Sequence, residues 1–294
     1  MNERVVRHGD GGVPPYALEI TPESAGWDHS GLRILVLAPG QSETFNTGDA
    51  EMLVLSLNGA AEVTVDGHTF QLEGRTDVFA GVSDLVYAPR GAEVSVFSAD
   101  GGRFALPSAC CDRRLDPAYL PKSAVPIEMR GAGQSSRQVN NFGVPGVLDA
   151  DRLIACEVLT PGGNWSSWPP HKHDEERDGE TALEEIYYFE VADGPAGPGL
   201  GYQRVYGHEG ADIDVTTEIR SGDAVLIPYG WHGPSIAAPG YDLYYLNVMA
   251  GPGEKRAWLI CDDPAHAWVR ETWADQAVDP RLPFASTVTA GGTR

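Results

Sequence analysis

The chain is organised around the stretch from Gly163 to Asn247, which contains Trp168-Pro169-Pro170-His171-Lys172-His173. Eleven residues after His173 begins Glu184-Glu185-Ile186-Tyr187-Tyr188-Phe189, and later comes Gly222-Asp223-Ala224-Val225-Leu226-Ile227-Pro228-Tyr229-Gly230-Trp231-His232. Alternate side chains of a β-strand share a face, so the first two histidines are expected to point the same way. Two histidines, a carboxylate and a distant third histidine can close a site for a divalent transition metal.

Two adjacent carboxylates compete for the fourth place in this site. Glu185 would share a strand face with Tyr187 and Phe189, and we therefore prefer it to Glu184. Glu175 and Glu176 lie nearer the histidines but sit in a charged loop, where we expect them to be solvated. Neutral imidazoles and one carboxylate suit Zn, Mn, Fe, Ni or Co. The expected metal ligands are His171, His173, Glu185 and His232.

Composition limits the classes of function. The chain has 294 residues, 42% of them hydrophobic, which is enough for a sizeable core in one large domain or two medium ones. The formal net charge is −21 and the Lys and Arg residues form no cluster, which argues against a nucleic-acid partner. We interpret the acidity as a contribution to solubility.

The cysteines and the N-terminus indicate a cytoplasmic protein without a membrane partner. None of the four cysteines forms a Cys-x-x-Cys pair, which favours reduced, incidental thiols. Met1-Asn2-Glu3-Arg4 leads into no apolar signal segment. No apolar run is long enough to span a bilayer.

Short apolar runs separated by turn residues predict an all-β protein with barrels or sandwiches. We expect a first domain at 1–106, a linker at 107–140 that packs across both halves, and a second domain at 141–294. A run with a proline at its start, Pro264–Trp273, is predicted to be a short helix. The expected strands are Leu32–Leu37, Glu51–Leu57, Ala61–Val65, Leu85–Ala88, Glu93–Phe97, Leu153–Leu159, Glu185–Val191, Gly201–Tyr206, Ile213–Ile219, Ala224–Ile227 and Tyr241–Val248.

The two halves share a pattern that indicates an internal duplication. Ser83–Gly91 and Asp223–Gly230 are both hydrophobic strands that run into Pro-x-Gly. The first copy has no His-x-His, and no histidine follows Gly91 as His232 follows Gly230. We therefore expect the second copy alone to hold a metal.

A metal acting as a Lewis acid on a carbonyl and its neighbouring hydroxyl suits aldose–ketose interconversion, which also needs a group to move one proton. Candidates for that group, or for hydroxyl contacts, are Tyr187, Tyr206 and Tyr245, although each also fits as barrel-wall packing. A sugar acid would need a cation for its carboxylate. The candidates are Arg204, Lys172, and Arg130 and Arg137 of the linker, although strand alternation points Lys172 away from the metal and Arg204 equally fits a surface ion pair.

The two motifs resemble those of the cupins, with a longer gap between His173 and Glu185 and a shorter Pro228-to-His232 spacing. A narrower family shares both departures, the 5-deoxy-glucuronate isomerases of myo-inositol catabolism. The resemblance covers nearly the whole chain and is carried by Pro169–Asp174, Leu183–Tyr188, Gln203–Tyr206, Tyr241–Gly251, Phe45–Glu51 and Arg130–Gly133.

This resemblance implies an all-β bicupin fold, with two antiparallel jelly-roll barrels in tandem. It also implies conversion of 5-deoxy-D-glucuronate to 5-dehydro-2-deoxy-D-gluconate. Similarity to the 4-deoxy-uronate ketol-isomerases of pectin breakdown implies zinc on the four ligands, with Mn²⁺ or Fe²⁺ as alternatives, and a homo-oligomer. Three other functions stay open: a pectin-pathway uronate isomerase, an Fe(II) cupin dioxygenase, and a non-catalytic sugar-binding cupin.

Overall fold

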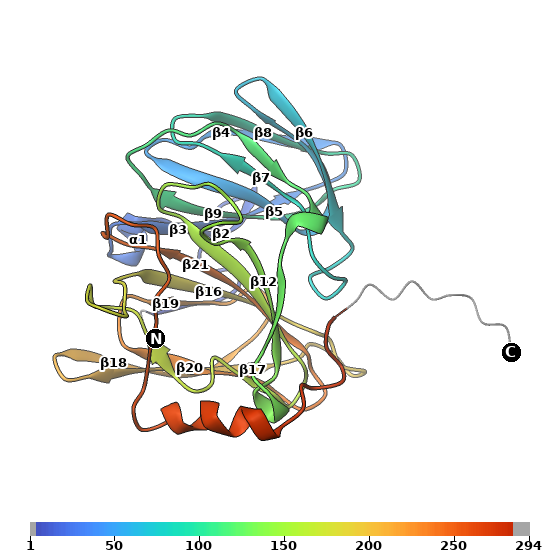
Figure 1. The fold of residues 1–294 in the computed structure, drawn as a ribbon. Coiled ribbons are helices and arrows are strands. Elements are labelled where there is room, and N and C mark those ends of the chain that lie inside the picture. The colour runs from blue at the N-terminus through green and yellow to red at the C-terminus, as the bar shows by residue number, and fades with distance from the viewer. Residues whose placement is uncertain (1–3, 285–294) are drawn as a thin grey trace, which may run out of the picture.

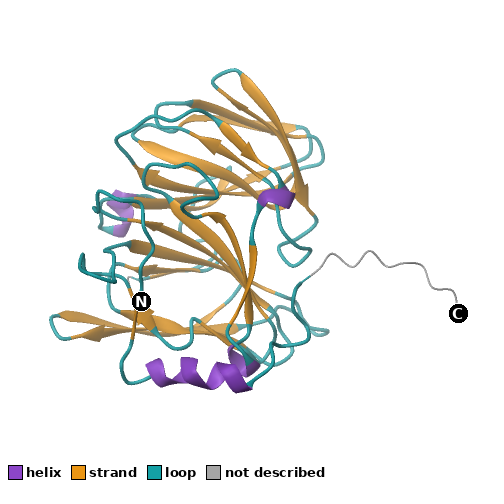
Figure 2. Cartoon of the chain, viewed as in Figure 1, coloured by secondary structure: helices purple, strands orange, loops and turns teal. Residues whose placement is uncertain are grey.

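The computed structural model describes residues 4–284, and it consists of two antiparallel β-barrels packed against each other (Figure 1). Helices are few and short, as Figure 2 shows. The all-β two-barrel fold expected from the sequence is confirmed. The first barrel contains α1 (Pro22–Ala25), β2 (Tyr16–Ile20), β3 (Ser30–Leu37), β4 (Gln41–Asn46), β5 (Ala50–Val65), β6 (His68–Arg75), β7 (Leu85–Ala88), β8 (Glu93–Ser98), β9 (Gly102–Cys110) and β10 (Ala118–Leu120).

The second barrel contains most of the remaining elements. Its helix η3 lies along the outer face of the barrel, at the bottom of Figure 1. The elements are β1 (Val5–Val6), β11 (Ile127–Arg130), β12 (Arg137–Gly143), β13 (Ile154–Thr160), β14 (Trp165–Ser166), β15 (His171–Lys172), β16 (Glu184–Val191), β17 (Gly201–His208), β18 (Ala211–Ile219), β19 (Ala224–Ile227), β20 (Trp231–Ala237), β21 (Leu243–Ala250), β22 (Cys261–Asp262), η2 (Gly133–Ser135) and η3 (Ala267–Asp275), and the short helix η1 (Lys122–Ala124) precedes them.

In one sheet of each barrel, equivalent strands follow one another in the same spatial order. The order is β10-β7-β5-β9-β3-β2 in the first barrel and β1-β19-β16-β21-β13-β12 in the second, with β11 added at the end. Each strand of this order except β11 thus has an equivalent in the other barrel, as an internal duplication predicts. The edge strand beside β19 is β1, which precedes the first barrel in the chain. The edge strand beside β7 is β10, which follows the other strands of the first barrel.

The segment 107–140 therefore contributes to both barrels. Within it, β10 pairs with β7 of the first barrel, whereas β11 and β12 extend the second barrel beside β13. The domain limits drawn from the sequence stay a prediction, because the strands at both margins are shared between the halves.

The two barrels meet through the faces of these two sheets. Residues of β3, β5 and β9 pack against residues of β13, β16 and β21 in one continuous buried cluster. Along β16, Ile186 and Tyr188 enter this cluster, while Tyr187 and Phe189 enter the separate interior of the second barrel. Strand alternation thus makes one strand serve two cores at once.

Two glutamates clamp the barrels together in a reciprocal way. The Glu51 carboxylate on β5 accepts backbone N–H groups of residues 151–153, at distances of 2.6–2.8 Å, from the loop that leads into β13. The Glu184 carboxylate on β16 accepts those of residues 28–30, at 2.9–3.0 Å, at the start of β3. Each barrel therefore supplies a carboxylate that satisfies backbone donors of the other.

A buried ion pair also crosses the interface. The Arg75 guanidinium on β6 donates two hydrogen bonds, of 2.9 and 2.7 Å, to the Glu157 carboxylate on β13, and both side chains are almost fully buried. Asn140 donates to the same carboxylate at 2.8 Å. The ring of Tyr244 lies below the guanidinium, 5.6 Å away.

Most expected strands are present, but three expectations need correction. Asn58-Gly59 does not end a strand, because β5 continues through it as a bulge in which Gly59 adopts a φ of 91°. The last central strand begins at Leu243 rather than Tyr241. The C-terminal helix spans Ala267–Asp275 as a 3₁₀-helix and begins three residues after Pro264. None of the helices in the described residues is long and apolar enough to cross a membrane.

The Arg75–Glu157 pair gives a stability prediction. Glu157→Ala should destabilise the protein by about 3–5 kcal/mol, because it leaves a buried guanidinium without its counter-ion. Urea unfolding followed by far-UV circular dichroism measures this. Glu218→Ala, which removes an exposed partner of Arg220, is the control and should cost less than about 1 kcal/mol. Equal losses for the two variants would contradict the assigned role.

Candidate metal centre

Three buried histidines converge at one end of the second barrel. The two-residue strand β15 lies between β20 and β22, and its His171 is the direct cross-strand partner of His232. His173 follows β15. Nitrogen atoms of the three imidazoles all lie within 4.8 Å of one another, which is close enough for a shared ion.

Glu185 brings a carboxylate from β16 to two of these three histidines. Its Oε2 atom lies 3.1 Å from Nε2 of His173 and 3.1 Å from Nε2 of His232. The side-chain amide of Asn247 on β21 donates to the other carboxylate oxygen. Glu184 faces the first barrel, so strand alternation separates the two adjacent carboxylates as the sequence predicts.

Backbone carbonyls orient two of the imidazoles. Nδ1 of His173 lies 3.2 Å from the Leu183 carbonyl, and Nδ1 of His232 lies 3.1 Å from the Gly230 carbonyl. These contacts place the proton on Nδ1 and leave the Nε2 lone pair directed at the cluster. Gly230 has a φ of 93°, and a Cβ there would lie 2.8 Å from the Tyr206 carbonyl, so the turn before His232 requires glycine.

The donor set fits a divalent transition metal. Although His232 Nε2 is close to Glu185, it makes no hydrogen bond of acceptable geometry among the described residues and is fully buried. Burial and the neighbouring imidazoles hold the pKa of His171 well below its usual range, so this ring is neutral. Burial would raise the pKa of Glu185, but hydrogen bonds and charge interactions with His173 and His232 lower it to about 2. Burial lowers the pKa of His173, but the contact with Glu185 raises it above its usual value, so His173 gives up its Nε2 proton when a metal binds. Neutral imidazoles and an ionised carboxylate are the forms that bind metal.

The first barrel lacks these ligands at the equivalent positions. In the first barrel, Asn46 and Glu93 occupy the cross-strand positions that His171 and His232 occupy in the second. Met52 and Ala88 likewise occupy the positions of Glu185 and Ile227. An amide, a thioether and an exposed carboxylate thus replace the imidazoles and the buried carboxylate.

A cavity opens beside His171. Tyr187 and Tyr245 form part of its wall and stack with their ring centroids 4.9 Å apart. Their hydroxyl groups lie 3.1 and 3.2 Å from Oγ of Ser167. Burial raises the pKa of both phenols, so both stay protonated at neutral pH. The other lining residues are Arg130, Arg137, Val139, Val158, Ser167, Asn247 and Trp258. A neighbouring cavity shares Arg130, Arg137, His171 and Trp258 with it and is also lined by Ile260 and Arg270.

Three candidates from the sequence do not line this cavity. The Tyr206 hydroxyl bonds to the Asp263 carboxylate, and Arg204 pairs with Asp214 across β17 and β18. Lys172 points away from the histidines, as alternation predicts. Catalytic or substrate-binding roles for these three stay predictions from the sequence, and the geometry of the cavity does not favour them.

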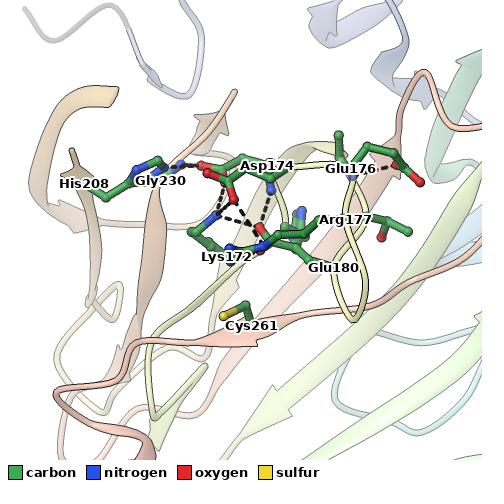
Figure 3. Close-up of polar contacts among 12 residues, drawn as sticks. Lys172, Asp174, Glu176, Arg177, Glu180, His208, Gly230 and Cys261 are labelled. Carbon is green, nitrogen blue, oxygen red and sulfur yellow. Dashed lines mark hydrogen bonds and ion pairs between the residues drawn. The ribbon is translucent and has the colours of Figure 1, made fainter. Parts of the chain in front are cut away.

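Lys172 instead belongs to a buried ionic network next to the site (Figure 3). Its ammonium lies 2.5 Å from Asp174 and 2.7 Å from Glu180. The Asp174 carboxylate also accepts the N–H of Gly230 at 2.7 Å and contacts His208 at 2.8 Å. This network joins the segment that follows His173 to the turn that precedes His232.

Several cavity residues were missed by sequence reasoning. Asn247 could have been found, since it lies two residues after Tyr245 on the same strand and so shares its face. Trp258 and Arg270 lie far along the chain in segments with no strand or metal pattern, and only the tertiary fold brings them to His171.

The fold and the site define the class of this protein as a two-barrel cupin with a buried candidate metal centre in its second barrel. Residues 5–269 match the model of the KduI/IolB family, and the chain belongs to that family. It is 40% identical over 260 residues to 5-deoxy-glucuronate isomerase of Geobacillus kaustophilus, covering 87% of this chain and 91% of the relative. It is 34% identical over 256 residues to the enzyme of the same name from Bacillus subtilis strain 168, covering 86% and 92%.

Solved structures agree on the fold. The crystal structure of an IolB-like protein from Salmonella typhimurium has a TM-score of 0.82 and 32% identity, covering 90% of this chain and 98% of that one. An oxalate decarboxylase from Lactobacillus farciminis, crystallised as a formate complex, has a TM-score of 0.63 at 14% identity, covering 89% of each chain. The second similarity supports the fold alone.

The adjacent glutamates give a matched test of the metal site. Glu185→Gln should lower zinc affinity by about 100-fold or more, because a charged ligand is lost. Glu184→Gln should keep the affinity while lowering the melting temperature, because it weakens the clamp on residues 28–30. Calorimetric titration with Zn²⁺ and thermal unfolding measure the two effects. Loss of zinc affinity in Glu184→Gln alone would contradict the assignment.

Proposed function

We propose that this chain is an isomerase that converts 5-deoxy-D-glucuronate to 5-dehydro-2-deoxy-D-gluconate. The observation that carries the proposal is a buried cluster of three histidines and Glu185 beside a cavity, in a chain 40% identical to a 5-deoxy-glucuronate isomerase. An aldose–ketose isomerisation needs a polarised carbonyl and a proton transfer between adjacent carbons.

The proposed metal ligands are His171, His173, Glu185 and His232. When bound, a divalent metal would supply Lewis-acid polarisation of the substrate's carbonyl and hydroxyl oxygens. We propose zinc as this metal, with Mn²⁺ and Fe²⁺ as alternatives that the same ligands suit.

The two stacked tyrosines are proposed to position the substrate. Because their phenols stay protonated, Tyr187 and Tyr245 can donate hydrogen bonds to substrate oxygens, and neither acts as a base in its resting state. Ser167, which contacts both hydroxyl groups, fixes their direction. Glu185 Oε2 lies 3.1 Å from Nε2 of both His173 and His232, so we assign this carboxylate to the metal rather than to proton transfer.

The wider setting is part of the proposal. We place the reaction in myo-inositol catabolism in the cytoplasm and expect the protein to form a homo-oligomer. The first barrel is proposed to carry no metal, since Asn46, Met52 and Glu93 replace the ligands.

Isomerisation can be followed directly. Zinc-loaded protein should convert 5-deoxy-D-glucuronate to the ketose, and ¹H NMR in D₂O should show deuterium at the carbon that receives the proton if the transferring group exchanges with solvent. His173→Ala should lose about 100-fold or more of kcat/KM, because a metal ligand is removed.

Other outcomes point to other functions. Turnover of a 4-deoxy-uronate in preference to 5-deoxy-glucuronate would favour the pectin-pathway isomerase. Consumption of O₂ by Fe(II)-loaded protein would favour a dioxygenase. Binding of the sugar acid without turnover would favour a sugar-binding cupin. Equal turnover by the parent and by His173→Ala would remove the metal from the mechanism.

A further inference from the structure

Arg137 is a buried cation without a counter-ion among residues 4–284. Arg137 is the first residue of β12, is only 5% exposed, and lines the same cavity as His171. Its guanidinium donates to the carbonyl oxygens of Ser135 and Trp168, at 2.9 and 3.3 Å, and lies 5.6 Å from the ring of Trp273. No carboxylate among the described residues forms an ion pair with it.

The neighbouring arginines differ from Arg137 in this respect. Arg130 forms two hydrogen bonds to the Glu128 carboxylate, of 2.9 and 2.7 Å, and Arg270 pairs with the Asp262 carboxylate at 2.7 Å. All three guanidinium groups line the cavity, but two of them are already neutralised. The excess positive charge therefore belongs to Arg137.

The backbone makes room for this arrangement. Gly131 adopts a φ of 76°, and a Cβ there would lie 2.8 Å from Nη1 of Arg137 and 2.2 Å from the Ser135 carbonyl. Burial, together with the guanidinium groups of Arg130 and Arg270, lowers the pKa of Arg137 to about 10. A buried charge in this state is costly unless an anion joins it.

We infer that this part of the cavity is a carboxylate subsite, in which Arg137 pairs with the acid group of a sugar-acid substrate whose other end reaches the metal centre. The inference rests on the proposed function for the identity of the substrate. An open-chain sugar acid carries its carbonyl and its carboxylate at opposite ends, and the cavity places His171 and Arg137 on its wall. A guanidinium binds a carboxylate through two parallel hydrogen bonds.

The kinetic test compares an acid with a neutral analogue. Kinetic constants would be measured for 5-deoxy-D-glucuronate and for 5-deoxy-D-glucose, which has an alcohol in place of the acid. The parent should prefer the acid, and Arg137→Met should lower kcat/KM for the acid by about 100-fold while leaving the neutral analogue little changed. Arg220→Met, on the exposed turn beside Glu218, is the matched control and should keep the preference.

A binding test is independent of turnover. Adipate has six carbons and a carboxylate at each end, and it cannot isomerise. Calorimetry should show that Arg137→Met weakens adipate binding to the zinc-loaded protein by about 30-fold or more, whereas Arg220→Met does not. Unchanged adipate affinity in Arg137→Met would overturn the subsite.

Thermal unfolding separates binding from a structural role. Without ligand, Arg137→Met should melt no lower than the parent, because the variant removes an uncompensated buried charge. A marked fall in melting temperature with an unchanged preference for the acid would assign Arg137 to the support of Ser135 and Trp168 instead.

The two proposals fail separately. If the parent does not isomerise 5-deoxy-D-glucuronate but binds adipate in an Arg137-dependent way, the proposed reaction is wrong and the subsite stands. If the parent isomerises the acid and Arg137→Met does so equally well, the reaction stands and the subsite is wrong.

Discussion

The alternation of side chains along β16 is the constraint on which the rest of this structure depends. One face of the strand sends Glu185, Tyr187 and Phe189 into the second barrel, and the other sends Glu184 and Ile186 toward the first. A shift by one residue would exchange the metal-facing carboxylate with the one that clamps residues 28–30. The packing of the two barrels thus fixes the register of the site, since Ile186 and Tyr188 fit only the shared core.

Buried charged side chains lie at the interface between the barrels and beside the histidines. Glu51 and Glu184 satisfy backbone donors across the interface, and Arg75 and Glu157 neutralise each other within it. Near the histidines, Lys172 pairs with Asp174 and Glu180, and Arg177 supplies a second cation to Glu180. Arg137, by contrast, has no ion-pair partner among the described residues, and it lies in the cavity where a substrate anion would balance it.

Much of the fold and the core of the site could be predicted from the sequence because both depend on local periodicity. Strand alternation selected Glu185 over Glu184 and directed Lys172 away from the histidines, and the geometry agrees with both. The repeated pattern at Pro89 and Pro228 also corresponds to equivalent strands, β7 and β19.

Features that depend on distant partners could not be predicted in the same way. No local pattern shows that β1 joins the second barrel or that the C-terminal helix η3 brings Arg270 to the cavity. Arg204 and Tyr206 were plausible on a strand near the site, but Asp214 and Asp263 engage them elsewhere. The gap between the expected strands Glu51–Leu57 and Ala61–Val65 is a bulge within β5 and not a turn, and the pair Asn58-Gly59 is typical of both.

The central claim is that one metal ion binds in the second barrel to His171, His173, Glu185 and His232. Anomalous diffraction from crystals of the zinc-loaded protein, recorded on both sides of the zinc absorption edge, tests it most directly. The account predicts one strong peak within about 2.0–2.2 Å of the three imidazole nitrogens and a Glu185 oxygen. A peak at Asp174, Glu175 and His208 instead, or in the first barrel beside Asn46 and Glu93, would contradict it.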